Sequence, residues 1–574
     1  MKQIKKIAGF ILATVMILAL NCVAFAAETA PTFPPAPTGI KADISKHTFT
    51  AYQIFKGDVV EGTLLNIDWG AGINASEFLE ALKASDAFKV DGVNPFASIT
   101  YDANATYKSA DAVARVMQDL KTPANSWASD DINNTTNELI TAATDRRARE
   151  FARIADANKT GTGVAAGQNL TAGYYLVVDE TTQLTGNNAV RNLSILQMVA
   201  NGPFQPINKT DVPELEKKVK EINDSDVKVT DKWGDVADYD IGDDVEFVLT
   251  GTLPTDYASY KTYKYVFHDT LGSGLTLNEN SVKVYINDVE INSGFTVATS
   301  DIDSDSLRVT FDNLKTNNNV NANSIIRVVY TAKLTGEGVV VGGSGNENKA
   351  HLEYSNDPNS DGTGTPPTGT TPEDKVVVFT YQLVADKVDE NGDALPGAGF
   401  SLYKLNKNNN TYEAYNPAGV VTTPKTDSDG NQYYEITDVT TFTFKGVDAG
   451  MYKLVETTVP TGYNKAEDMY FTIKATIDET TQSVTELKIE NVQDKDGKVI
   501  TDATGNQVYT FTTEMTEGEN PRPTGNLDTD IVNLKGILLP STGGIGTTIF
   551  YIVGGILVVG AGIVLVAKKR MNSR

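Results

Sequence analysis

The 574-residue chain contains very little cysteine. Its one cysteine, Cys22, lies in an N-terminal segment with the pattern of a cleavable signal, so we expect none in the mature protein. A chain without cysteine has no disulfides, no thiolate zinc sites and no catalytic thiols. An exported protein of this composition must hold its domains together by packing or by another covalent bond.

Histidine is almost as scarce. The three histidines, His47, His268 and His351, stand in no recognisable triad or metal signature, which argues against a hydrolase. Residues 427–438 resemble the start of a calcium loop, but Gln432 replaces the expected glycine and Asp438 the expected glutamate. We therefore predict a polar turn there, no enzyme activity, no cofactor and no metal site.

Basic charge is also low. Lysine and arginine number 49 against 74 aspartates and glutamates, which gives a net charge of -25. Nucleic-acid binding requires a basic surface, so we predict no nucleic-acid partner. At about 150 residues per domain, the length corresponds to three or four domains.

The two ends of the chain carry membrane signals. Residues 1–26 combine a basic start, an apolar run and an Ala-Phe-Ala cleavage site, which is the pattern of a signal peptide. Residues 545–567 are uncharged and apolar, and the tail at 568–574 is basic. We predict a transmembrane segment with a cytoplasmic tail, so that the chain is exported and held at its C-terminus.

The first region, 27–209, contains segments with the hydrophobic periodicity of helices and others with that of strands. Ser76–Phe88 and Asn137–Ala155 have helical spacing, whereas Thr48–Phe55 and Gly173–Val178 alternate as strands do. We predict an α+β domain here.

From residue 210 the helical pattern is absent, and short alternating runs between Gly, Asn and Asp turns take its place. Examples are Val245–Thr250, Ser281–Asn287, Leu307–Phe311 and Ile325–Leu334. The Pro-, Gly- and Thr-rich stretch 356–372 predicts a linker or long loop. We expect a mainly β fold: an α+β domain, a middle Ig-like β-sandwich at 210–372 and a C-terminal one at 373–538.

Polar side chains share the apolar face of several predicted strands. Residues two apart on a strand lie on one face, so this pattern directs a lysine, an acid and an asparagine inward in each sandwich. The sets are Lys217, Asp269 and Asn348 in the middle region, and Lys387, Glu456 and Asn533 in the C-terminal one.

Such a set has a chemical use. Burial favours the neutral amine of a lysine and the protonated form of an acid, which can then polarise a carboxamide. Attack by the amine on the asparagine releases ammonia and leaves an isopeptide bond, which would join the first strand of each sandwich to its last. Ordinary salt bridges, or strand faces shifted by one residue, would explain the same pattern without a bond.

The C-terminus also carries a specific motif. Leu539, Pro540, Ser541, Thr542 and Gly543, followed by the apolar run and the basic tail, resemble the LPxTG sorting signal. The resemblance implies cleavage by a sortase between Thr542 and Gly543.

Motifs around the reactive residues resemble those of Gram-positive pilins and collagen adhesins. Residues 452–463 (YKLVETTVPTGY) are similar to the pilin E-box, with Glu456 as the bond-promoting acid, and 387–400 (KVDENGDALPGAGF) to the start of an adhesin B-type domain. Residues 213–219 (PELEKKV) and 348–354 (NKAHLEY) resemble strands of adhesin A-type domains, and Asp269 fits the aspartate position. Asn491 remains an alternative to Asn533, and Lys218 an alternative to Lys217.

Taken together, the chain resembles the backbone pilins of Gram-positive bacteria. The resemblance implies that a sortase joins Thr542 of one subunit to a lysine of the next, and Lys209 in residues 203–210 (PFQPINKT) is the candidate, although the segment departs from the family's YPK-like motif. Expected partners are pilus-specific and housekeeping sortases, identical subunits in a head-to-tail polymer, accessory pilins and peptidoglycan. A monomeric wall-anchored adhesin is the alternative.

Overall fold

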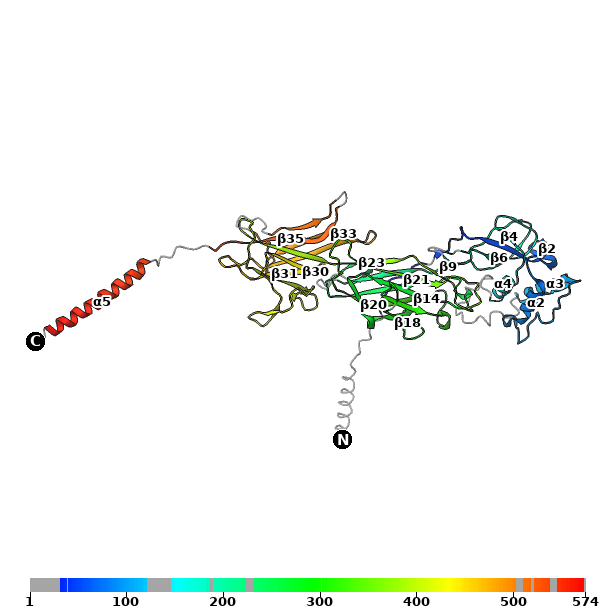
Figure 1. Cartoon of the computed structure of the whole chain (residues 1–574), viewed down its shortest axis with the longest axis horizontal. Helices are drawn as coiled ribbons and strands as arrows, with labels where there is room; N and C mark the ends of the chain where they lie inside the picture. Colours follow the sequence, from blue (N-terminus) through cyan, green and yellow to red (C-terminus); the bar gives the residue numbers. More distant parts are fainter. Residues whose placement is uncertain are drawn as a thin grey trace, which may run out of the picture.

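The computed structural model describes residues 31–38, 40–120, 146–182, 184, 189–222, 231–300, 302–501, 509–517, 521–536 and 545–571. Three packed units follow one another along the long axis, and helix α5 (Ile545–Met571) extends beyond the last of them (Figure 1). The predicted signal peptide at 1–26, the sorting motif at 539–543 and part of the predicted helix, 137–145, lie outside the described residues.

The first unit is a sheet with helices packed on one face. The sheet has the order β3-β2-β6-β7, with β4 also paired to β2. Its helices bury apolar residues at helical spacing, as Phe78, Leu79 and Leu82 of α2 do, against the sheet core. The elements are β2 (Phe49–Val60), β3 (Thr63–Trp69), α2 (Ala75–Ala84), η1 (Asp86–Phe88), α3 (Thr106–Leu120), α4 (Arg146–Ala157), β4 (Val164–Ala165), β6 (Gly173–Asp179) and β7 (Ile195–Val199). The predicted α+β character is confirmed.

The middle unit is a sandwich of two seven-stranded sheets around one apolar core. The first sheet contains β10 (Leu215–Glu221), β11 (Lys232–Gly234), β13 (Asp244–Gly251), β15 (Leu275–Leu277), β16 (Lys283–Ile286), β17 (Val289–Ile291) and β20 (Ile326–Leu334). The second contains β12 (Val236–Asp238), β14 (Tyr265–Leu271), β18 (Thr296–Ala298), β19 (Leu307–Phe311), β21 (Asn346–Ser355), β22 (Thr368–Thr370) and β23 (Asp374–Phe379).

The middle sandwich extends past the boundary expected at residue 372. β23 pairs with β21 in the second sheet, and the polar stretch 356–372 is a loop within this unit that includes the short strand β22, rather than a linker to the next unit. The Pro- and Gly-rich composition marked the loop correctly, but composition does not reveal that the chain returns to the same sheet.

The C-terminal unit is a second, smaller sandwich around its own core. One sheet has the order β30-β24-β35-β34 and the other β26-β25-β31-β32-β33, with β29 also paired to β25. The strands are β24 (Tyr381–Asp389), β25 (Gly399–Asn406), β26 (Thr411–Tyr415), β29 (Ile436–Thr437), β30 (Thr441–Val447), β31 (Gly450–Thr458), β32 (Met469–Asp478), β33 (Ser483–Gln493), β34 (Phe511–Met515) and β35 (Pro523–Asn533). The predicted mainly β fold is confirmed.

Short elements complete the fold. Two-stranded pairs are formed by β1 (Ile40–Lys41) with β9 (Asp211–Val212), β5 (Asn169–Leu170) with β8 (Gly202–Pro203), and β27 (Lys425–Thr426) with β28 (Gln432–Tyr433). Single 3-10 turns occur at η4 (Tyr257–Ser259), η5 (Glu279–Ser281) and η6 (Leu314–Thr316). The residues that resembled a calcium loop start at the turn between β27 and β28, where the Asp427 carboxylate accepts backbone N–H groups.

Residues 31–38 pack on the middle sandwich, although the expected N-terminal domain began at residue 27. The Trp233 Nε1 donates to the carbonyl of Thr32 at 3.0 Å, and the Phe33 ring lies 5.0 Å from the Tyr285 ring. An aromatic side chain flanked by prolines has no strand period, so alternation gave no indication of this docking.

Helix α5 covers the residues predicted to span the membrane. Judged over the described residues alone, however, no helix is both long enough and apolar enough to cross a membrane.

Candidate functional site

The three residues predicted to react in the middle sandwich lie on three different strands. Lys217 lies on β10 of the first sheet, whereas Asp269 on β14 and Asn348 on β21 lie on neighbouring strands of the second. All three side chains are buried, with at most 1% of each residue exposed. Alternation along the strands therefore directs them into the space between the two sheets.

A tyrosine connects the three residues. The Lys217 ammonium is paired with the Asp269 carboxylate and also donates to Tyr330 Oη at 2.9 Å. Tyr330 Oη donates to Asp269 Oδ1 at 2.9 Å and accepts from Asn348 Nδ2 at 2.8 Å. Sequence reasoning missed Tyr330: its place on the inward face of β20 was readable, but a buried tyrosine is usually a core residue.

Burial moves the ionisation of this set toward neutral groups. It lowers the pKa of Lys217 and raises the pKa of Asp269, and in each case the opposite charge of the partner counteracts part of the effect. The pKa of Tyr330 is raised well above its usual value by burial and by the nearby Asp269. Both shifts run in the direction of a neutral amine beside a protonated carboxyl group.

The C-terminal set is arranged differently. Lys387 on β24 and Asn533 on β35 lie on parallel neighbouring strands of one sheet, and Glu456 reaches them from β31 in the other. Lys387 Nζ donates to the carbonyl of Ile531 at 2.7 Å, and Asn533 Nδ2 donates to Glu456 Oε1 at 2.7 Å. The second Glu456 oxygen accepts the N–H of Ala466 at 2.6 Å.

This second lysine is also shifted toward its neutral form. Burial lowers the pKa of Lys387 to about 8, against the opposing charge of Glu456. At neutral pH a substantial minority of Lys387 would carry an uncharged amine, which is the form that attacks a carbonyl carbon.

The two asparagines share one more feature. Within the described residues, Asn348 Oδ1 and Asn533 Oδ1 are buried without a hydrogen-bond partner. A buried carbonyl oxygen without a hydrogen-bond partner lowers the stability of the fold by about 1–3 kcal/mol, so such atoms are rare in native structures. In both sets the amide nitrogen is held while the oxygen stays available for protonation.

The alternatives from the sequence occupy different places. Asn491 is exposed and has a φ of 59°, a left-handed conformation that asparagine tolerates well. Lys218 is half-buried and pairs with Asp235 at 2.7 Å and Glu216 at 3.1 Å. Neither residue lies in a buried set with an acid and an asparagine.

Lys209 lies where the first unit meets the middle one, just before β9. Its side chain is exposed, and it makes no ion pair or hydrogen bond with any residue that the structure describes. Its backbone N–H donates to Asn192 Oδ1 at 2.9 Å. The main chain is therefore fixed while the amine remains accessible.

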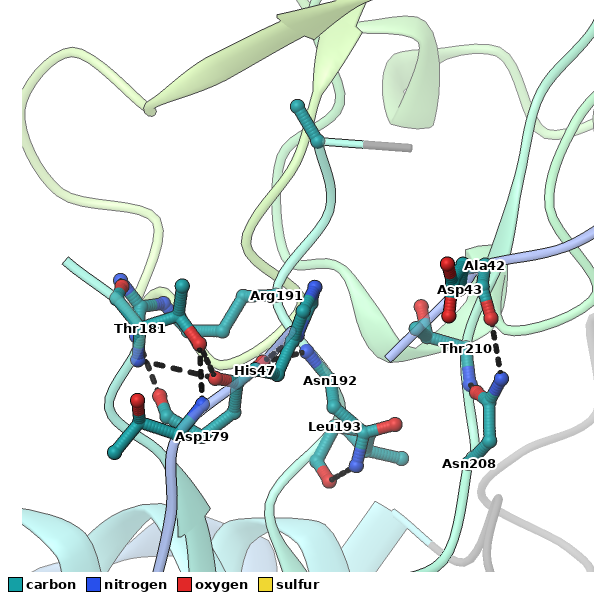
Figure 2. Close-up of polar contacts among 12 residues, drawn as sticks. Ala42, Asp43, His47, Asp179, Thr181, Arg191, Asn192, Leu193, Asn208 and Thr210 are labelled. Carbon is teal, nitrogen blue, oxygen red and sulfur yellow. Dashed lines mark hydrogen bonds and ion pairs between the residues drawn. The ribbon is translucent and has the colours of Figure 1, made fainter. Parts of the chain in front are cut away.

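The residues around this segment form a buried polar network (Figure 2). Asn192 donates its N–H to Asp179 Oδ2 at 2.7 Å, and the same oxygen contacts His47 Nδ1 at 2.7 Å. On the other side, Asn208 Nδ2 donates to the carbonyl of Ala42 at 2.6 Å. These contacts hold the segment that carries Lys209 against the body of the first unit.

Comparison with protein families gives two matches. Residues 382–493 match the SpaA prealbumin-like fold domain, which covers much of the C-terminal sandwich. Residues 535–573 match the LPXTG cell wall anchor motif, which includes the predicted sorting signal.

One full-length relative is similar over most of the chain. The trypsin-resistant surface T6 protein of Streptococcus pyogenes serotype M6 is 28% identical over 444 residues, which cover 67% of this chain and 74% of that protein. The chain is therefore similar to a streptococcal surface protein and carries a cell wall anchor motif at its C-terminus. The predicted extracellular location, anchored to the cell wall, is confirmed.

Solved structures of major and backbone pilins also align with the chain. The T6 backbone pilin of S. pyogenes covers 88% of the chain and all of its own length at 18% identity, with a TM-score of 0.44. The full-length major pilin SpaD of Corynebacterium diphtheriae covers 67% of the chain and 86% of its own length at 18% identity, with a TM-score of 0.39.

Proposed function

We propose that this chain is the shaft subunit of a covalent pilus in which each sandwich is closed by a self-formed Lys–Asn isopeptide bond and a sortase joins successive subunits. The observation that carries the internal bonds is the repeated burial of a lysine, an acid and an asparagine in both sandwiches, with each asparagine oxygen lacking a hydrogen-bond partner among the described residues.

In the middle sandwich, Lys217 Nζ attacks Asn348 Cγ while Asp269 moves the protons. The Nζ–Cγ bond forms, the Cγ–Nδ2 bond breaks, and the amide nitrogen leaves as ammonia after it receives the one proton that the neutral amine loses. Tyr330 supports this step because its hydroxyl contacts all three residues. The bond would join β10 to β21 and so link the two sheets. β23 follows β21, so the expected link from first strand to last does not hold in this sandwich.

In the C-terminal sandwich, Lys387 attacks Asn533 with the same balance of atoms. Glu456 already contacts the amide nitrogen that would leave, which supports its role as the acid. The bond would join β24 to β35, the first and last strands of this unit. A force applied along the shaft would then pass through the cross-link rather than unzip the sheet.

Polymerisation would involve a different lysine from those of the internal bonds. We propose that a pilus-specific sortase cleaves after Thr542 and transfers its carboxyl to the Lys209 amine of the next subunit, and that a housekeeping sortase attaches the finished fibre to peptidoglycan. The exposure of Lys209, with its backbone fixed by Asn192, supports this choice. Lys217, eight residues on, is buried and therefore unsuited to an enzyme-mediated transfer.

The test is an immunoblot of boiled, detergent-treated wall extracts from cells with the wild-type chain, Lys209→Ala and Lys46→Ala. Lys46 is an exposed lysine of the same unit and serves as the matched control. We expect a high-mass ladder in the wild type and in Lys46→Ala, and its loss in Lys209→Ala.

Two other results would contradict parts of the proposal. A ladder that survives Lys209→Ala would assign the linkage to another lysine. A single band in every strain would favour a monomeric wall-anchored adhesin.

A further inference from the structure

Three lysines are buried among the residues that the structure describes: Lys217, Lys387 and Lys404. The first two belong to the sets described above. Lys404 lies on β25 of the C-terminal sandwich, is 6% exposed, and takes no part in the proposed Lys–Asn bonds.

Lys404 lies where the middle and C-terminal sandwiches meet. Its Nζ is 2.5 Å from Oδ2 of Asp240, which follows β12 of the middle sandwich. It is 2.7 Å from Oδ1 of Asp448, in the turn between β30 and β31. Asp240 Oδ1 in turn accepts the N–H of Asp448 at 2.9 Å. One amine thus contacts carboxyl groups from both domains.

The surroundings contain more acid than one lysine can balance. Asp238 Oδ2 accepts the N–H of Ala449 at 3.3 Å, and Glu221 Oε2 accepts the N–H of Asp238 at 2.9 Å. Burial raises the pKa of Asp238 to about 6 and that of Glu221 to about 8. Buried acids close to one another retain protons, because several charges of one sign are costly in a low dielectric.

Aromatic rings enclose the same site. The centre of the Tyr415 ring lies 5.5 Å from Lys404 Nζ and that of Tyr452 lies 5.7 Å from it. The Tyr452 hydroxyl donates to Asp448 Oδ1 at 2.9 Å. An amine held in contact with a carboxyl group and shielded from water is the arrangement from which an amide can form by loss of water.

We propose that Lys404 and Asp240 form an isopeptide bond that joins the middle and C-terminal sandwiches covalently. The neutral Lys404 amine attacks Cγ of the Asp240 carboxyl group (COOH), the Nζ–Cγ bond forms, and the Cγ–OH bond breaks. Asp448 carries a proton from the nitrogen to the departing hydroxyl, which leaves as water. The reaction consumes no co-reactant. It goes beyond the Lys–Asn bonds because it uses a carboxyl group, releases water instead of ammonia, and crosses between two domains.

The bond would have a mechanical consequence. The two sandwiches already meet through a backbone hydrogen bond from Ile241 to Gly446, at 3.0 Å. A covalent link beside it would fix the angle between the sandwiches and carry load across the junction without relying on packing alone.

The test is a peptide map of the denatured full-length chain after digestion with trypsin and a glutamate-specific protease. We expect residues 233–246 linked to residues 391–407, with no cleavage after Lys404 and a combined mass lower by one water. Asp240→Ala and Asp448→Ala should restore cleavage after Lys404. Asp244→Ala, which removes a nearby exposed acid, should leave the link in place.

Unlinked 233–246 together with a peptide ending at Lys404 in the wild type would overturn the proposal and identify the cluster as an ion-paired contact. The same map reads the Lys–Asn bonds separately, because each of those would lower the mass by one ammonia. Failure of one proposal is therefore distinguishable from failure of the other.

Discussion

The middle and C-terminal sandwiches bury the same three residue types but connect them differently. In the middle sandwich the acid is paired with the lysine, and Tyr330 connects both to the asparagine. In the C-terminal sandwich the acid contacts the asparagine, and the lysine contacts the carbonyl of Ile531. The acid therefore contacts the lysine, the proposed nucleophile, in the middle sandwich. In the C-terminal sandwich it contacts the amide nitrogen that would leave.

The two bonds would also constrain different parts of a sandwich. Lys217 and Asn348 lie on opposite sheets, so their bond would hold the two layers together. Lys387 and Asn533 lie on parallel neighbouring strands, so their bond would hold the first and last strands of one sheet. The presence of a lysine, an acid and an asparagine therefore does not determine which strands a bond would join.

The largest expected effect comes from Asp269→Ala. It should prevent the bond between Lys217 and Asn348. Without this cross-link the unfolded chain gains entropy, which lowers the free energy of unfolding of the middle sandwich by about 5 kcal/mol and its melting temperature by about 10–20 °C. Calorimetry of the full chain measures it.

Thr270→Ala, at the exposed neighbouring position, is the control and should leave the transition in place. The C-terminal transition should not move in either variant. Equal shifts in both sandwiches would contradict the independence of the two sets.

A pH dependence should distinguish the unlinked C-terminal set. In Asn533→Ala, Lys387 stays buried with its pKa at about 8, below its unfolded value of 10.5. The unfolded state then binds more protons between these values, so stability should rise with pH through this window, by at most about 3 kcal/mol.

The measurement is the melting temperature of Asn533→Ala against that of the double variant Asn533→Ala, Lys387→Met from pH 7 to 10. The double variant lacks the titrating amine and should not show the rise. Parallel curves would mean that burial does not shift Lys387.

Tyr330→Phe should slow the middle bond only. The variant removes the hydroxyl that connects Asp269 to Asn348, and a positioned proton-transfer group contributes about 100-fold or more to a rate. Pulse-labelled chains, mapped at intervals for the linked Lys217 peptide, give this rate.

Tyr354→Phe is the matched control, since Tyr354 is equally buried and its hydroxyl has no partner in the described part of the chain. A normal rate in Tyr330→Phe would remove the tyrosine from the mechanism and make the two sandwiches more alike than proposed.

The smallest effect is expected from Asn491→Gly. Glycine adopts the left-handed backbone of this position and removes the alternative amide, so the C-terminal bond should form as in the wild type. Peptide mapping should find Lys387 linked in this variant and unlinked in Asn533→Ala. The reverse pattern would assign the bond to Asn491.

Strand alternation predicted much of this arrangement. The pattern of β24 alone predicts that Tyr381, Leu383, Ala385 and Lys387 share a buried face, and they do. Alternation predicts which face of a strand a residue lies on, but not which strands are neighbours. For this reason neither the contacts of Tyr330 nor the sheet that contains Asn348 was predictable. Lys404 was also missed, because the two acids that contact it come from separate segments that only the packing of two domains brings together.

The most direct test of the account is a peptide map of the denatured full-length wild-type chain for the two internal bonds. The account predicts Lys217 linked to Asn348 and Lys387 linked to Asn533, each pair lighter than its separate peptides by one ammonia. Cleavage after both lysines, with both asparagine peptides at their unmodified mass, would contradict it.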